Sequence, residues 1–259
     1  MDKNIPVVIL CGGAGTRLAE ITDVIPKPLV EVGGKPLLWH IMKHYAKFGF
    51  NEFYLALGYK GDQIKRYFLE FHLMNKDFCI SLNNGKITIL NDNEEEDWKV
   101  HLIDTGRDTL TGGRLKYLAH YLNRGTFMMT YGDGVSNVDI NRLLDFHYQN
   151  GGLVTLTAVR SPARFGSLEF EGNTITFFKE KSTLAEGWIN GGFFVIEPGA
   201  MDYIKGNVMW EHGPMEQLAR ERKMIAYKHE GFWQCVDTLR DLRYLESLWD
   251  SGSPPWKIW

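Results

Sequence analysis

Apolar residues in the first half of the chain form short continuous runs that alternate with longer segments of helical spacing. The short runs are typical of buried strands: Val7–Leu10, Glu52–Leu57 and Phe127–Tyr131. The longer segments repeat apolar residues every third or fourth position, which predicts amphipathic helices: Leu37–Phe48, Ile64–Leu73 and Leu115–Leu122. Strands that alternate with helices favour an α/β fold with a Rossmann-like, doubly wound, mixed but mostly parallel sheet. Ligands of such sheets bind at the loops that follow the strands.

One stretch breaks this alternation with short segments that resemble hairpin strands. The segments are Cys79–Leu82, Lys86–Leu90 and Lys99–Ile103, with Asn83-Asn84-Gly85 between the first two. Together they predict a β-hairpin insertion. The acidic connection from Asn91 to Asp97 could form a cation site, but mutually repelling charges favour a solvated loop.

The second half of the chain is richer in strands. Its strand-like segments are Leu153–Val159, Ser167–Phe170, Thr174–Phe178 and Trp188–Ile196. We expect them to extend the sheet of the first half, and Asp241–Trp249 to form an amphipathic helix. The tail tryptophans Trp249, Trp256 and Trp259 could pack on the same chain or on a partner subunit. No linker separates the halves, so we expect one domain over 1–259, with a nucleotide-binding half at about 1–150 and a sugar-phosphate-binding half with the C-terminal helix and tail at about 151–259.

Composition limits the partners and the location. The 29 basic and 32 acidic residues nearly balance, which gives no electrostatic reason for a nucleic-acid or membrane partner. The sequence shows neither a membrane-span pattern nor a signal-peptide pattern, so we expect a cytoplasmic protein. Cys11, Cys79 and Cys235 have no disulfide or zinc-site spacing, and we interpret them as reduced.

The stretch LCGGAGTR, Leu10–Arg17, carries the first chemical signal. Three glycines within four positions directly after a buried strand allow backbone N–H groups to converge on an anion such as phosphate. A tight turn is the alternative, and the spacing matches neither the dinucleotide nor the Walker pattern. Thr16, Arg17 and Lys27 favour phosphate, because a hydroxyl and two cations follow the same strand.

Several motifs resemble those of the sugar-1-phosphate nucleotidyltransferases. They are LCGGAGTRL at Leu10–Leu18, PKPLVEVGGKPLLWHIM at Pro26–Met42, TYGDGV at Thr130–Val135, RFGSLEF, FKEKS, INGGFFVI and CVDTLRD. The resemblance spans essentially the whole chain. It implies attack by a sugar-1-phosphate oxygen on the α-phosphorus of a nucleoside triphosphate, with release of pyrophosphate.

The resemblance also implies site residues. The catalytic residues would be Arg17, Lys27, Asp133 and Asp237, and the last two would bind a Mg²⁺ cofactor, which prefers carboxylate oxygens. The implied nucleotide site comprises Leu10, Cys11, Gly12, Gly13, Gly15, Thr16, Arg17, Lys27, Thr111, Gly112, Gly113, Arg114, Gly132 and Asp133. The implied sugar-phosphate site comprises Arg164, Gly166, Glu180, Lys181, Asn190 and Gly191.

The substrates follow from a narrower likeness. DTG with TGGRLK, then NGGFFV, DTLRD and a PPWK tail, is most similar to family members that join CTP and glucose 1-phosphate. In that case Arg114, with backbone groups of Gly112 and Gly113, would read the cytosine edge. Relatives of this kind assemble into multimers, which implies a homo-oligomer. A uridylyl- or thymidylyltransferase and a non-catalytic nucleotide-sugar sensor remain as alternatives, the second disfavoured by the presence of all the implied catalytic residues.

Overall fold

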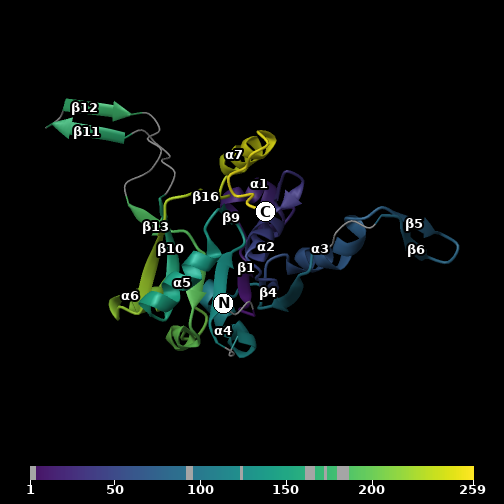
Figure 1. Cartoon of the computed structure of the whole chain (residues 1–259), viewed down its shortest axis with the longest axis horizontal. Helices are drawn as coiled ribbons and strands as arrows, with labels where there is room; N and C mark the ends of the chain where they lie inside the picture. Colours follow the sequence, from purple (N-terminus) through teal and green to yellow (C-terminus); the bar gives the residue numbers. More distant parts are fainter. Residues whose placement is uncertain (1–3, 92–95, 123–124, 161–166, 172–173, 180–186) are drawn as a thin grey trace.

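The central feature of the computed structural model is a large sheet that runs through the molecule (Figure 1). The structure describes residues 4–91, 96–122, 125–160, 167–171, 174–179 and 187–259. Within them the sheet has eight strands in the order β13-β10-β14-β8-β1-β4-β7, with β15 beside β10. The sheet strands are β1 Val7–Cys11, β4 Glu52–Leu57, β7 Lys99–Asp104, β8 Phe127–Tyr131, β10 Val154–Arg160, β13 Trp188–Asn190, β14 Phe194–Ile196 and β15 Met224–His229.

Helices and smaller strand pairs complete the fold. The α-helices are α1 Ala19–Thr22, α2 Leu37–Lys47, α3 Gly61–Met74, α4 Thr111–Leu122, α5 Ile140–Asn150, α6 Pro214–Arg220 and α7 Leu239–Asp250. The 3-10 turns are η1 Thr16–Leu18, η2 Lys27–Leu29 and η3 Pro198–Tyr203. Paired outside the sheet are β2 Glu31–Val32 with β3 Lys35–Pro36, β5 Phe78–Ser81 with β6 Lys86–Ile89, β11 Ser167–Glu171 with β12 Thr174–Lys179, and β9 Gly134–Ser136 with β16 Trp233–Cys235.

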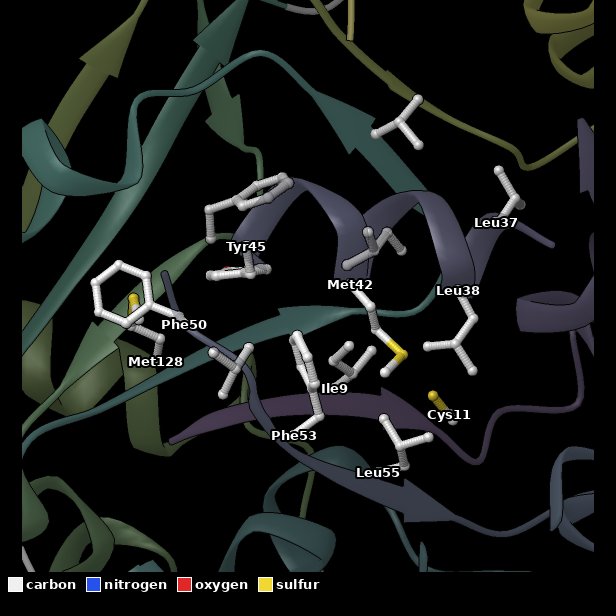
Figure 2. Close-up of a cluster of buried hydrophobic side chains, with 14 of the residues drawn as sticks. Ile9, Cys11, Leu37, Leu38, Met42, Tyr45, Phe50, Phe53, Leu55 and Met128 are labelled. Carbon is white, nitrogen blue, oxygen red and sulfur yellow. The ribbon is translucent and has the colours of Figure 1, made fainter. Parts of the chain in front are cut away.

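Alternate residues of β1 enter two separate hydrophobic cores, because successive side chains of a strand point to opposite faces. Val7, Ile9 and Cys11 join the core beneath α2, α5 and α7. Val8 and Leu10 join the core beneath α4, η3 and α6. Figure 2 shows the first core, where side chains of α2 lie over β1 and β4. The sheet is therefore covered on both faces, which confirms the doubly wound α/β prediction.

The predicted strand directions are confirmed in the first half and extended by the second. β8, β1, β4 and β7 run parallel to one another, whereas β14 is antiparallel to both β8 and β10. The predicted segment Trp188–Ile196 forms two sheet strands, interrupted at Gly191–Phe193, where Gly192 and Phe193 have φ of 75° and 48°. The parallel sheet thus continues into a mixed one.

One predicted element belongs to a different part of the fold. Lys99–Ile103 is no part of the hairpin insertion, because it lies in β7 and pairs with β4 of the central sheet. As the last strand of the sheet path it is half-exposed, so its alternating pattern resembles that of a hairpin strand. The predicted hairpin itself is confirmed as β5 and β6, which extend beyond α3 and away from the sheet (Figure 1).

The C-terminal tail packs on its own chain. Trp256 is 1% exposed, lies 5.6 Å from Phe232 between ring centres, and donates from Nε1 to His40 Nδ1 at 3.4 Å. Trp249 and Trp259 contact the ring of His40 on α2. Packing within the chain, one of the two predicted arrangements, is therefore confirmed for these tryptophans. Among the described residues no helix is both long and apolar enough to span a bilayer.

Candidate active site

The glycine loop, residues 12–15, begins where β1 ends at the carboxyl edge of the sheet. A Cβ atom on Gly12 would lie 2.2 Å from the Arg114 guanidinium, so only glycine fits there. Gly15 has a φ of 65°, which glycine adopts without strain. Two glycines are thus required by the loop itself, whereas Gly13 faces open space, with nothing within 4 Å of its Cβ direction.

Arg114 lies beneath this loop and holds its backbone. Nη1 donates to Leu57 O, Thr105 Oγ1 and Gly106 O at 2.7–2.8 Å. Nη2 donates to Gly12 O at 3.0 Å and to Arg107 O at 3.2 Å. The side chain is 3% exposed, and burial lowers the pKa of Arg114 although the Asp104 carboxylate opposes that shift. Both terminal nitrogens thus donate to oxygens of the chain, and the contact of Arg114 with a base stays a prediction.

Lys27 is the centre of an ion network that joins distant parts of the chain. Its Nζ lies 2.6 Å from Asp133 Oδ2 and 2.8 Å from Asp237 Oδ1. The other oxygen of Asp237 lies 2.7 Å from Arg17 Nη1. Burial acts to lower the pKa of Lys27, but the Asp133 and Asp237 carboxylates outweigh it and raise that pKa. All four predicted catalytic residues therefore meet at one place.

A small strand pair brings the two aspartates together. β9 follows Asp133 and pairs with β16, and Val236 N donates to Asp133 O at 2.9 Å. Asp237 then precedes α7, whose first turn carries Asp241. The Asp241 Oδ2 atom accepts from Asp237 N at 3.1 Å and from both N and Oγ1 of Thr238 at 2.9 Å. This capping box fixes the backbone that carries Asp237.

Two cavities meet at this network. The first cavity, of 610 Å³, is lined by the glycine loop, Lys27 and the residues from Arg107 to Thr111. The second cavity, of 830 Å³, is lined by Asn190, Glu211, Trp233 and the start of α7. Five of the described residues line both: Arg17, Tyr131, Asp133, Met209 and Asp237. Each volume suits a small-molecule ligand, and their shared wall carries the charged groups.

A comparison of the chain with models of protein families shows the family to which it belongs. Residues 6–249 match the family described as nucleotidyl transferase. The chain belongs to the nucleotidyl transferase family. Glucose-1-phosphate cytidylyltransferase of Salmonella typhi is 46% identical over 97% of this chain and 98% of the relative. The "probable glucose-1-phosphate cytidylyltransferase" of Bacillus subtilis (strain 168) is 42% identical over 97% and 99%.

Among solved structures, that of HddC from Yersinia pseudotuberculosis has the same fold. It superposes with a TM-score of 0.67 at 22% identity and covers 95% of this chain and 99% of its own. The predicted α/β fold class is confirmed by this likeness, which covers both halves of the sheet.

Most of the predicted nucleotide residues of this nucleotidyl transferase line the first cavity. They are Leu10, Cys11, Gly12, Gly13, Gly15, Thr16, Arg17, Lys27, Thr111, Arg114, Gly132 and Asp133. Gly112 and Gly113 are not among the residues that line it, so their contact with the base stays a prediction. They lie in the first turn of α4 and face the segment 207–210, where Gly113 N donates to Val208 O at 3.1 Å.

The predicted sugar-phosphate residues are only partly within the described chain. Asn190 and Gly191 line the second cavity. The Asn190 side chain donates from Nδ2 to Tyr131 Oη at 3.3 Å and accepts from Gly192 N at 2.9 Å. Arg164, Gly166, Glu180 and Lys181 lie outside the described residues.

Several residues that line the cavities of this nucleotidyl transferase were absent from the sequence prediction, and three of them stand out. Tyr131 ends β8 and lines both cavities, Glu211 follows the buried Trp210, and Trp233 donates from Nε1 to Gly191 O at 2.7 Å. Tyr131 could have been found, because it is the last residue of a predicted strand. Glu211 and Trp233 lie in segments whose positions depend on long-range pairing, which gives no local sequence signal.

The donor set of this nucleotidyl transferase fits a divalent cation. Asp133 and Asp237 each place one oxygen within 2.8 Å of a single ammonium nitrogen, so a compact cation between them has two hard oxygen ligands. Mg²⁺ takes one or two carboxylates and completes its shell with water and phosphate. In the part of the chain that the structure describes, no group of three or more His, Cys, Asp or Glu side chains could hold a metal. A cation held by these two aspartates would therefore need water or phosphate oxygens to complete its shell.

Proposed function

We propose that this enzyme transfers the cytidylyl group of CTP to α-D-glucose 1-phosphate and forms CDP-glucose and pyrophosphate. The observation that carries the proposal is the network of Arg17, Lys27, Asp133 and Asp237 at the junction of two cavities. One cavity suits the triphosphate beside the glycine loop, and the other suits the sugar phosphate. The names of the two relatives at 42% and 46% identity support CTP and glucose 1-phosphate as the pair.

The reaction needs alignment and neutralisation of phosphate charge more than covalent chemistry by the protein. Lys27, which lines the first cavity and contacts Asp133 and Asp237 of the shared wall, would bind the α-phosphate, where negative charge increases as the sugar-phosphate oxygen attacks. Arg17 is more exposed and would hold the phosphates that leave as pyrophosphate. The pKa of Lys27, raised by its aspartates, keeps this side chain a cation at neutral pH.

We propose that Asp133 and Asp237 hold Mg²⁺ during turnover. When bound, Mg²⁺ would neutralise phosphate oxygens and so assist the displacement. Lys27 donates to one oxygen of each carboxylate, so its ammonium would share these ligands with a metal held there. Lys27 would bind the nucleotide phosphates from this position.

The acceptor would lie in the second cavity. Asn190 offers an amide to sugar hydroxyls, and Trp233 presents an aromatic ring in the same wall. We propose that Glu180 and Lys181 of the FKEKS motif complete this site, with Lys181 on the sugar phosphate. Replacement of Lys181 by alanine should then raise the KM for glucose 1-phosphate more than it changes kcat.

A pyrophosphate-release assay tests the proposed reaction. Each of CTP, UTP, dTTP and ATP is offered with glucose 1-phosphate, with and without Mg²⁺. We expect turnover with CTP that depends on Mg²⁺. Faster turnover with UTP or dTTP would overturn the cytidylyl assignment, and turnover with none of the four would overturn the enzyme assignment.

We further propose that the enzyme is a homo-oligomer whose contact includes α3 and the β5–β6 hairpin. This part of the surface carries exposed apolar side chains: Leu69 at 81%, Met74 at 73%, Leu82 at 88% and Leu90 at 65%. Exposed apolar patches of this kind mark protein contacts. Sedimentation of Leu82→Glu should show a smaller assembly than wild type, whereas Tyr148→Glu on α5 should not.

We also propose that the enzyme works in the cytoplasm without a nucleic-acid or membrane partner. The near balance of 29 basic and 32 acidic residues supports this, because no excess of basic charge attracts a polyanion. Fractionation of source cells tests the location, and recovery of activity with the membrane fraction would contradict it.

A further inference from the structure

Glu211 makes two short hydrogen bonds to hydroxyl groups from different parts of the fold. Tyr131 Oη donates to Glu211 Oε1 at 2.6 Å, and Thr111 Oγ1 donates to Glu211 Oε2 at 2.6 Å. Hydrogen bonds from hydroxyls to carboxylates are stronger than neutral ones, and these lengths are typical of them. Each oxygen of the carboxylate therefore holds a different element.

The two hydroxyl groups belong to the two cavities. Thr111 begins α4 and lines the first cavity, and its Oγ1 also accepts from Trp210 N at 2.7 Å. Tyr131 lines both cavities, and its Oη accepts from Asn190 Nδ2 at 3.3 Å. A continuous chain of hydrogen bonds thus runs from Thr111 through Glu211 and Tyr131 to Asn190.

The hydrogen-bond directions in this chain are fixed by the groups themselves. Burial, followed by the Glu211 carboxylate, raises the pKa of Tyr131, so the phenol remains protonated and donates to Glu211. Its oxygen is left to accept from the Asn190 amide. A movement of any side chain in this chain of hydrogen bonds therefore changes the geometry of the next hydrogen bond.

We propose that Glu211 is a positioning residue that couples occupation of the first cavity by CTP to binding of the sugar phosphate in the second. The proposal rests on the proposed function, because it names the substrates of that reaction. A nucleotide that contacts the start of α4 would fix Thr111, and Glu211 would transmit that position through Tyr131 to Asn190. The coupling is reciprocal, so the sugar phosphate tightens CTP by the same factor.

Binding of α,β-methylene-CTP, which cannot release pyrophosphate, measures this coupling. Calorimetry gives its Kd with Mg²⁺, in the absence and presence of saturating glucose 1-phosphate. We expect the sugar phosphate to tighten binding to wild type by about tenfold, within the range common for coupled sites. In Glu211→Gln, which has the same shape but cannot accept both hydroxyls through carboxylate oxygens, the ratio should fall to less than about twofold.

Glu197→Gln is the matched control. Glu197 also accepts two side-chain hydrogen bonds, from Thr126 Oγ1 at 2.7 Å and His147 Nε2 at 3.0 Å, but it lines neither cavity. This variant should keep the wild-type coupling ratio. Equal loss of coupling in Glu197→Gln would show a general effect of destabilisation and overturn the role of Glu211.

A second pair of variants keeps the test independent of Glu211 itself. Thr111→Ser retains the hydroxyl and should keep the coupling, whereas Thr111→Val should lose it. Unchanged coupling in Glu211→Gln, or equal coupling in both Thr111 variants, would overturn the proposal, as would wild type without coupling. Turnover of CTP and glucose 1-phosphate by wild type is measured first, since its absence would overturn the proposed function. If wild type turns over but Glu211→Gln keeps the wild-type coupling ratio, only the proposed role of Glu211 is overturned.

Discussion

The Arg114 guanidinium occupies the space that a side chain on Gly12 would need, and its Nη2 donates to the Gly12 carbonyl at 3.0 Å. The glycine loop therefore lies on the buried Arg114 guanidinium, and the loop backbone accepts one of the hydrogen bonds of this cation. A positive charge that is only 3% exposed thus lies directly beneath the loop. That arrangement favours anions above the loop while leaving its surface open.

A comparison of Gly12→Ala with Gly13→Ala distinguishes the effect of the glycine loop on packing from its effect on ligand binding. In Gly12→Ala the new methyl group would displace Arg114, so we expect a loss of about 2 kcal/mol in unfolding free energy. In Gly13→Ala nothing lies within 4 Å of the new atom, and stability should change by less than about 0.5 kcal/mol. Urea denaturation measures both values.

Initial rates complete the comparison of these two variants. Gly13→Ala should raise the KM for CTP about tenfold or more, because the methyl group would stand where phosphate approaches the backbone. A KM unchanged from wild type would show that the triphosphate does not approach Gly13.

Asp133→Asn should lower kcat about 10²- to 10³-fold, the effect typical of losing one charged group at a phosphoryl or acyl transfer centre. The substitution removes a ligand of the proposed Mg²⁺ site and leaves Lys27 with one carboxylate instead of two. Binding of CTP should weaken far less than kcat, since the glycine loop is intact. Steady-state rates and calorimetry check the two effects, and Asp250→Asn at the exposed end of α7 is the control. An active Asp133→Asn enzyme would exclude this aspartate from the metal site.

Asp241→Ala should lower both stability and turnover, because Asp241 caps α7 and holds the Asp237 backbone. We expect a loss of about 1 kcal/mol from the cap. Asp139→Ala is a matched control, since Asp139 caps α5 by accepting from Arg142 N at 3.0 Å and lines neither cavity. The control should lose similar stability while keeping its kcat. Equal kcat in the two variants would show that Asp241 does not act through Asp237.

Acid should destabilise the fold through His40 and His44. Burial lowers the pKa of each to about 4, from an ordinary value near 6.5. Between those values the unfolded chain binds more protons than the folded one, so stability rises with pH across this window and falls on acidification. The loss approaches about 3 kcal/mol for each histidine by pH 4.

Urea denaturation between pH 7 and pH 4 measures this dependence. His40 holds the tautomer that donates from Nε2 to Val32 O at 2.8 Å and accepts at Nδ1 from Trp256. His40→Gln should show about half of the wild-type slope, because one of the two titrating groups is gone. A slope equal to that of wild type would assign the acid sensitivity to other groups.

Much of the fold was predictable because local pattern and burial agree. β4 has the predicted bounds Glu52–Leu57, and its residues 53–57 are buried, as a continuous apolar run requires. β7 was assigned to the wrong element because a strand at the sheet's edge has one exposed face and so resembles a hairpin strand. The sequence pattern indicates how much of a strand is buried, but it does not indicate which strand pairs with it.

The candidate site was predictable where its residues lie in motifs at strand ends. Lys27, Asp133 and Asp237 meet as expected, although their direct ion pairs are a result of the structure. Arg114 shows what could not be predicted from sequence. Its helix was predicted, but the direction of its side chain depends on the loop carbonyls of Gly12, Leu57 and Gly106, to which it donates. Glu211 was missed for the same reason, since its partners are 80 and 100 residues away.

The strand pair β9–β16 also has a consequence for synthesis on the ribosome. Lys27 meets Asp133 across 106 residues and Asp237 across 210, so the second contact awaits the last part of the nascent chain. Contacts between residues far apart in sequence also form slowly. An incomplete polypeptide released before residue 237 would therefore contain the glycine loop without the complete centre.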